Sequence, residues 1–112
     1  MKTLANLTPP IVSVTITAGP ANSTVKVRGN FNANGSTIAS KSWGYHYKID
    51  SSSSSPSSYT TTQRTGQITS TKEDTYSFTS AGYTTSQYVH VRAFATNAGG
   101  TTYSSWINRK LT

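Results

Sequence analysis

The sequence predicts an all-β protein in which antiparallel strands pack as a sandwich in a single domain. Apolar and polar residues alternate with a period of two along most of the 112 residues. No segment carries the apolar stripe of period 3.6 that marks an amphipathic helix. The length suffices for one domain, because a chain of this size buries roughly 65% of the surface that its unfolded form exposes.

The first two predicted strands, residues 11–18 and 23–29, show the alternation most plainly. Their inward side chains are Val12, Val14 and Ile16 in the first strand and Val25 and Val27 in the second. Hydroxyl and basic side chains fill the alternate positions. One face of each strand is therefore expected to be buried and the other to meet solvent.

Residues 40–49 and 75–79 continue the pattern with aromatic side chains. Trp43, Tyr45, Tyr47 and Ile49 share the inward face of 40–49, His46 and Lys48 lie opposite, and Tyr76 and Phe78 share one face of 75–79. A further strand between Tyr59 and Ile68 would bring the total to seven. The serine-rich stretch 51–58 is expected to be a solvated loop that adds nothing to the core.

The strand at 87–97 is followed by a hairpin and by the last predicted strand, 101–111. Val89, Val91, Ala93 and Ala95 are expected to be buried, while His90, Arg92 and Phe94 face away from the core. Glycines at 99 and 100 suit a tight hairpin, because they adopt positive φ angles without strain. The last strand is expected to send Tyr103, Ile107 and Leu111 inward and Trp106 outward.

Residues 1–10 are expected to form an extended N-terminal arm, and residues 11–112 the sandwich domain. Pro9 and Pro10 oppose a helix here, and the arm is too short to bury Leu4 and Leu7 within itself. Two arrangements are open. The arm packs along the domain's own sheet edge, or it reaches a neighbouring subunit and buries its leucines there, which would make Leu4 and Leu7 partner-binding residues.

The run AGYTTSQYVHVRAFATNAGGTTY (81–103), with SWGYHY (42–47), resembles the fibronectin type III-like and immunoglobulin-like modules of bacterial surface proteins and phage virion proteins. In these modules a strand of the form Tyr-x-Val-Arg-Ala-Tyr-Ala-x-Asn leads into a Gly-Thr-x-Tyr turn. The positions that match are Val91, Arg92, Ala93, Phe94, Ala95, Asn97, Gly100, Thr101 and Tyr103. Tyr88 lies one position early, and Tyr83 stands where the modules have leucine. The resemblance implies a seven-stranded immunoglobulin-like sandwich with a binding or spacer role.

Composition argues against several classes of site. The chain has no cysteine, so it can hold neither a disulfide nor a thiolate metal site. His46 and His90 lack the further ligands that a zinc site requires, and no Gly-x-Ser-x-Gly motif accompanies the many serines. We therefore expect a non-enzymatic protein with no cofactor and no metal.

The charge of the chain favours an acidic partner. Ten Lys and Arg residues against three Asp and Glu residues give a net charge of +7. The basic residues are spread along the chain, whereas a nucleic-acid groove would concentrate them on one face among stacking aromatic rings, so no specific nucleic-acid binding is expected. No apolar run suits a membrane span or a secretion signal, so we expect no membrane partner.

If the strands at 40–49, 87–97 and 101–111 lie side by side, their outward side chains form one aromatic and basic surface. Its members would be His46, Lys48, His90, Arg92, Phe94 and Trp106. Arg92 and Phe94 could instead serve cross-strand packing alone, and Trp106 could be covered by the chain's own loop or arm. An outward indole is nonetheless typical of an interface, so His90, Arg92, Phe94 and Trp106 join the two leucines as candidate partner-binding residues.

Two functions are compatible with these features. The first is a structural accessory protein, such as a decoration or auxiliary protein of a phage capsid, assembled in the host cytoplasm and bound to the capsid shell of the virion. The second is an adhesion, carbohydrate-binding or spacer module of an exported bacterial protein, at the cell surface or secreted, with surface glycans as partners. The lack of a recognisable secretion signal favours the first function.

Overall fold

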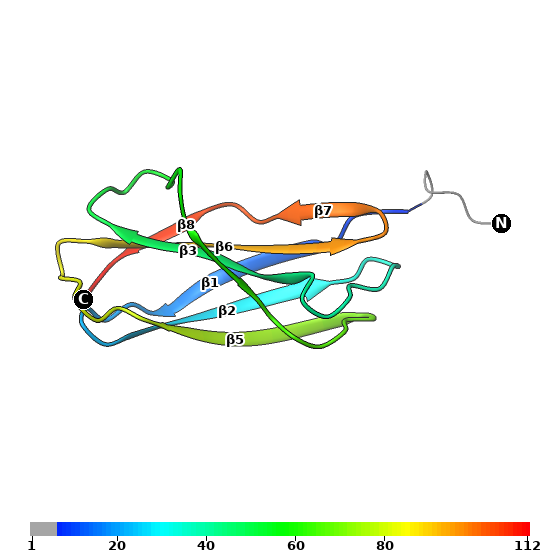
Figure 1. Ribbon diagram of the computed structural model, residues 1–112, viewed down its shortest axis with the longest axis horizontal. Coiled ribbons are helices and arrows are strands. Elements are labelled where there is room, and N and C mark those ends of the chain that lie inside the picture. The colour runs from blue at the N-terminus through cyan, green and yellow to red at the C-terminus, as the bar shows by residue number, and fades with distance from the viewer. Residues whose placement is uncertain (1–6) are drawn as a thin grey trace.

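Two antiparallel β-sheets pack face to face in the computed structural model, which describes residues 7–112 (Figure 1). The three-stranded sheet has the order β1-β2-β5, with β1 (Ile11–Ala18), β2 (Thr24–Asn32) and β5 (Thr71–Thr79). The five-stranded sheet has the order β4-β3-β6-β7, and β8 also pairs with β6. The strands of this sheet are β3 (Trp43–Asp50), β4 (Thr60–Gln63), β6 (Tyr88–Asn97), β7 (Gly100–Tyr103) and β8 (Ile107–Lys110). The described residues contain no helix, which confirms the predicted all-β sandwich.

The inner faces of the two sheets form one apolar core. The alternation predicted for the longer strands is confirmed, with buried side chains at Val14, Val25, Val27, Trp43, Tyr45, Val89, Val91, Ala93 and Ala95. Aromatic rings bridge the two sheets: Phe31 packs edge-on against Trp43 with ring centroids 4.8 Å apart, and Tyr47 stacks on Phe78 at 4.1 Å. Such pairs stabilise the core beyond the burial of their area.

Gly29 leaves space in this core for the ring of Tyr45. A Cβ atom at Gly29 would lie 2.6 Å from the Tyr45 hydroxyl oxygen and 2.7 Å from Cε2 of Phe31. The Tyr45 hydroxyl donates a hydrogen bond to Oδ2 of Asp74 on β5, at 2.8 Å. Burial raises the pKa of Tyr45 far above its usual value of 10, so the phenol keeps its proton and remains a donor.

Arg64, which follows β4, connects the two sheets through the same carboxylate. Its Nε and Nη2 donate to Oδ2 and Oδ1 of Asp74 at 3.0 Å and 3.2 Å, and its guanidinium lies 5.0 Å from the ring centroid of Tyr76. Asp74 is buried, and the three hydrogen bonds from Arg64 and Tyr45 offset the cost of taking its charge out of water.

The structure has eight strands where the sequence predicts seven, because the predicted strand 101–111 is interrupted. β7 and β8 both pair with β6, with Tyr103 opposite Phe94 and Ile107 opposite Val91. Four steps along the β7–β8 segment therefore match three steps along β6. The extra residue forms a β-bulge. Residues before the bulge therefore face the opposite side of the sheet from the side that uninterrupted alternation would assign to them. The prediction that Tyr103 points inward is wrong for this reason: the residue is 52% exposed.

The segment that enters β1 is fixed to the end of the sandwich where β2 and β6 finish. The hydroxyl of Thr8 donates to the carbonyl of Asn34 at 2.8 Å, and the side-chain amide of Asn34 donates to the carbonyl of Pro9 at 2.9 Å. The side-chain amide of Asn97 donates to the carbonyl of Thr8 at 2.9 Å. Leu7 is partly buried here, and Leu4, the other predicted partner-binding leucine, lies outside the described residues.

The C-terminal end of the chain is fixed at the opposite end of the molecule (Figure 1). The backbone N–H of Thr112 donates to the carbonyl of Gly19 at 2.8 Å, and the N–H of Ala21 donates to the carbonyl of Thr112 at 2.8 Å. These bonds attach the C-terminal residue to the turn between β1 and β2.

Candidate functional site

Six side chains gather on the outer face of the five-stranded sheet, around Arg92. We call them the Arg92 cluster: His46, Tyr59, Arg92, Phe94, Tyr103 and Trp106. Arg92 lies on the central strand β6, with His46 directly opposite on β3. Tyr59 reaches in from the β4 side of the sheet, and Tyr103 and Trp106 come from the other edge.

The guanidinium of Arg92 lies among three aromatic rings. Its Cζ atom is 5.1 Å from the ring centroid of Tyr59, 4.5 Å from that of Tyr103 and 4.8 Å from that of Trp106. Each distance is within the range of a cation–π interaction, which is worth about 0.5–1 kcal/mol at an exposed site and more when water is excluded. The three rings therefore hold the arginine side chain in one place.

Two hydrogen bonds fix the orientation of this guanidinium. Nε donates to Nδ1 of His46 at 2.9 Å, and Nη2 donates to the Tyr59 hydroxyl at 3.3 Å. Both acceptors lie along the same edge of the guanidinium group, the edge formed by Nε and Nη2. The His46 ring is in turn held between Tyr59 and Phe94, stacked at 4.2 Å and 4.8 Å between ring centroids.

His46 is a neutral acceptor in this arrangement. Nδ1 receives the Arg92 hydrogen bond, so the ring proton belongs on Nε2. Burial, followed by the neighbouring positive charge of Arg92, lowers the pKa of His46 from 6.5 to about 4. The only uncompensated charge at the centre of the cluster at neutral pH is therefore that of Arg92.

Arg92 has no acidic partner among residues 7–112, in contrast to two other arginines. Arg64 is paired with Asp74, and Arg28 on β2 with Glu73 at 3.2 Å. Asp50, the third acid of the chain, is engaged by His90. The charge of Arg92 is thus available to a group from outside this part of the chain.

The exposure of the candidate residues differs from the prediction. His90, Arg92 and Phe94 do lie on the face away from the core, but only Arg92 is partly accessible, since His90 is fully buried and Phe94 is 9% exposed. The ring of His46 covers Phe94. Trp106 is half-buried, against Arg92 and Tyr59, so part of its indole is covered by the chain itself and part remains accessible.

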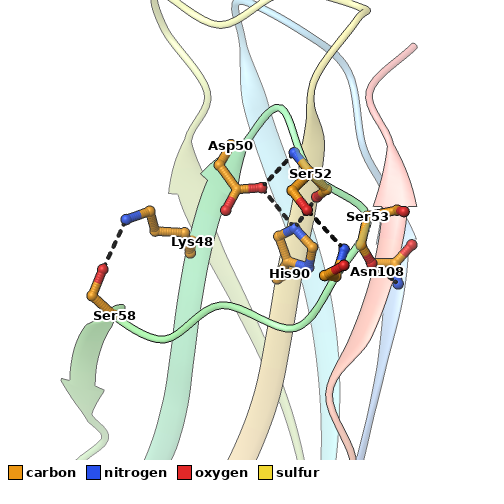
Figure 2. A network of polar contacts seen from close by, with 8 residues as sticks. Lys48, Asp50, Ser52, Ser53, Ser58, His90 and Asn108 are labelled. Carbon is orange, nitrogen blue, oxygen red and sulfur yellow. Dashed lines mark hydrogen bonds and ion pairs between the residues drawn. The ribbon is translucent and has the colours of Figure 1, made fainter.

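His90 is buried because the serine-rich loop folds over it, which sequence reasoning missed (Figure 2). Its Nε2 lies 2.9 Å from Oδ1 of Asp50 and 2.7 Å from the carbonyl oxygen of Ser52. Because a carbonyl only accepts, Nε2 carries the proton. Nδ1 is buried without a partner in the part of the chain described.

Two further bonds hold this loop, so the prediction of a loop that is merely solvated is incomplete (Figure 2). The side-chain amide of Asn108 on β8 donates to the carbonyl of Ser53 at 3.3 Å, and Nζ of Lys48 donates to the hydroxyl of Ser58 at 3.0 Å. The loop ends at Tyr59, and its attachment therefore helps to place that ring in the Arg92 cluster.

Sequence reasoning missed Tyr59 and Tyr103 as members of the site. Tyr59 is the first residue after the serine-rich stretch, and nothing local predicts that its ring reaches across β3. Tyr103 faces outward only because of the bulge at 104–106. Tyr59 and Tyr103 are the most exposed residues of the cluster, at 41% and 52%.

A second surface feature lies on the three-stranded sheet. A depression of about 410 Å³ is lined by residues of β1, β2 and β5: Ile11, Val12, Ser13, Asn30, Phe31, Asn32, Thr71, Lys72 and Glu73. Ile11, one of these lining residues, is 58% exposed. Four of the nine lining residues carry an amide or a hydroxyl group, and the others are apolar or charged.

Residues 7–112 bring no three metal-ligating side chains together, and they include no apolar helix long enough to cross a membrane. Comparisons of the chain with protein families, with curated proteins and with solved structures give no match. The Arg92 cluster offers a rigid cation, aromatic surface and hydrogen-bond donors. Those groups suit recognition of another molecule.

Proposed function

We propose that this chain is a non-enzymatic structural accessory protein that binds a larger protein assembly through the Arg92 cluster, and that the assembly is a phage capsid shell. The single observation that carries the proposal is Arg92, an arginine that has no acidic partner among residues 7–112 and is held among three partly accessible rings. Arginine, tyrosine and tryptophan are the residue types that dominate binding energy at protein interfaces.

The fold supports a module of the immunoglobulin-like class, which the sequence pattern also favours. If β7 and β8 are counted as one strand interrupted by a bulge, the sandwich has seven strands, three in one sheet and four in the other. Such sandwiches serve many unrelated functions, so the binding role rests on the Arg92 cluster and not on the fold.

Charge supports an acidic partner. The net charge of +7 speeds encounter with a negatively charged surface, and contacts repeated on a symmetric shell would add to one another. The virion is accordingly the proposed location, with assembly in the host cytoplasm.

The test is the composition of particles encoded by the same genome. Gradient-purified particles would be analysed by quantitative mass spectrometry for copies of this chain per shell subunit, with the wild type, Arg92→Ala and Trp106→Ala. Arg28→Ala is the matched control, because it removes the same charge from the outer face of the other sheet. We expect Arg92→Ala and Trp106→Ala to lower the copy number and Arg28→Ala to leave it unchanged.

Two results would overturn the proposal. Absence of the wild-type chain from the particles would reject the capsid, and equal incorporation of all variants would reject the Arg92 cluster as the interface. Melting temperatures of the purified variants establish that each has folded.

A glycan-binding module of an exported protein is the second candidate. The depression on the three-stranded sheet favours it, since amides and hydroxyls such as those of Asn30, Ser13 and Thr71 suit sugar hydroxyl groups. The Arg92 cluster favours it less, because the guanidinium already lies against the ring faces on which a sugar would stack. Binding of the chain to a glycan panel, abolished by Asn30→Ala and retained in Arg92→Ala, would establish this alternative.

A further inference from the structure

We propose that the Arg92 cluster is a receptor for one carboxylate group, supplied by an aspartate or glutamate side chain of the partner. This inference rests on the proposed function, since it names the chemistry by which the Arg92 cluster would recognise its partner. It follows from counting the hydrogen-bond donors of Arg92.

A guanidinium has five N–H donors, one on Nε and two on each Nη nitrogen. Arg92 uses the Nε donor on His46 and one Nη2 donor on Tyr59. The two Nη1 donors and the second Nη2 donor have no partner among residues 7–112. One Nη1–H and the remaining Nη2–H point in parallel from the end of the side chain, and two parallel donors match the two oxygens of a carboxylate.

Arg64 shows the pairing that Arg92 lacks. There a carboxylate, that of Asp74, takes the parallel donors of Nε and Nη2 at 3.0 Å and 3.2 Å. At Arg92 the equivalent edge is filled by two neutral acceptors, His46 and Tyr59. Neutral acceptors satisfy hydrogen bonds but leave the positive charge uncompensated, so the free edge of Arg92 favours an anion.

The surroundings of Arg92 reduce the cost of binding that anion. The rings of Tyr59, Tyr103 and Trp106 fix the guanidinium before a partner arrives, so little side-chain entropy remains to be lost. They also displace water from its faces, which strengthens an ion pair formed at its edge. Lysine could not replace arginine here, because an ammonium has no parallel fork and does not stack.

The first experiment observes the arginine Nε–H resonances by NMR during titration with acetyl-Gly-Glu-Gly-amide. We expect a saturable shift of the Arg92 resonance, at least about tenfold more sensitive to this peptide than to the matched acetyl-Gly-Gln-Gly-amide, because only the former carries a carboxylate. Arg64 is the internal control, since its carboxylate is already in place. No shift at Arg92, or an equal shift at Arg28 and Arg92, would overturn the inference.

Inorganic phosphate distinguishes a carboxylate receptor from a general anion site. We expect phosphate to shift the Arg92 resonance less than the glutamate peptide does at equal concentration. An equal or larger response to phosphate would overturn the assignment to a carboxylate.

Arg92→Lys separates this inference from the proposed function. It keeps the charge and removes the fork, so we expect it to lower incorporation into particles as far as Arg92→Ala does. Normal incorporation of Arg92→Lys, with reduced incorporation of Trp106→Ala, would reject the carboxylate receptor and leave the interface standing. A positive peptide titration without any chain on the particles would reject the capsid and leave the receptor standing.

Discussion

Arg92 on β6 donates its Nε–H to Nδ1 of His46 on β3, at 2.9 Å, from a position directly opposite in the sheet. The bond requires an unprotonated Nδ1, so the orientation of the guanidinium depends on the neutral state of the histidine. The stability of this face of the sandwich is therefore coupled to pH.

The first prediction is that His46 makes the fold less stable as the pH falls from about 6.5 to about 4. Burial and Arg92 lower the pKa of His46 to about 4 in the folded chain, so over this interval the unfolded chain binds a proton that the folded chain does not. The free energy of unfolding falls by at most about 3 kcal/mol over this interval. Above the pKa of the unfolded chain His46 is neutral in both states, so it makes no pH-dependent contribution to stability there. Urea unfolding from pH 7.5 to 4 would measure it.

His46→Gln is the control for that measurement, because glutamine keeps an acceptor near Arg92 and does not titrate. The difference in unfolding free energy between wild type and variant should change with pH. A difference that stays constant from pH 7.5 to 4 would show that His46 is not the titrating group.

The second prediction concerns the buried carboxylate between the sheets. Asp74→Ala should lower the free energy of unfolding by about 3 kcal/mol, because it leaves Arg64 without its ion pair and removes the carboxylate to which the Tyr45 hydroxyl donates. Tyr45→Phe should lower it by only about 1 kcal/mol, since one hydrogen bond is lost and the ion pair stays. Guanidinium unfolding of both variants would give the order, and an effect of Tyr45→Phe equal to that of Asp74→Ala would contradict it.

The third prediction concerns packing at Gly29. Gly29→Ala should destabilise the fold by about 1–3 kcal/mol, because the new methyl group would overlap the Tyr45 hydroxyl and the Phe31 ring. Gly19→Ala is the matched control, since its methyl group would meet only the flexible side chain of Arg109 at 3.4 Å. Thermal melting of the two variants should show a clear fall for the first and little change for the second.

The fourth prediction concerns the bulge. Removing Ser105 would equalise the steps between the pairs Tyr103–Phe94 and Ile107–Val91, so the shortened chain should fold with one continuous edge strand. Removing Thr102 from β7 should be more disruptive, because it shifts Tyr103 out of register with Phe94. A lower melting temperature for the Ser105 deletion than for the Thr102 deletion would refute this reading of the bulge.

Much of the fold could be predicted because strand alternation is a local property. Val89, Val91, Ala93 and Ala95 are buried as the pattern predicts, and Arg92 lies on the opposite face. The prediction for Tyr103 failed for a local reason that the pattern does not reveal. One additional residue between β7 and β8 interrupts the alternation, so Tyr103 faces outward instead of inward.

The exposure of a side chain is harder to predict than the face of the sheet on which it lies, because exposure depends on segments distant in the chain. His90 faces outward, yet the loop that carries Ser52 and Ser53 covers it. Ser52, which contacts His90, lies 38 residues from it in the sequence. Tyr59 contacts Arg92 from 33 residues away. Serine-rich composition predicts a loop but carries no information about which surface that loop will cover.

The attachments of Thr8 and Thr112 at opposite ends of the sandwich have a mechanical consequence. Thr8 is tied to Asn34 and Asn97 at one end, and Thr112 to Gly19 at the other. Tension applied through these two points would run along the strands, whereas the ladder hydrogen bonds run across them. Many of those hydrogen bonds would be loaded in shear at the same moment instead of breaking one after another. The sandwich would therefore resist extension by a force applied between its two ends.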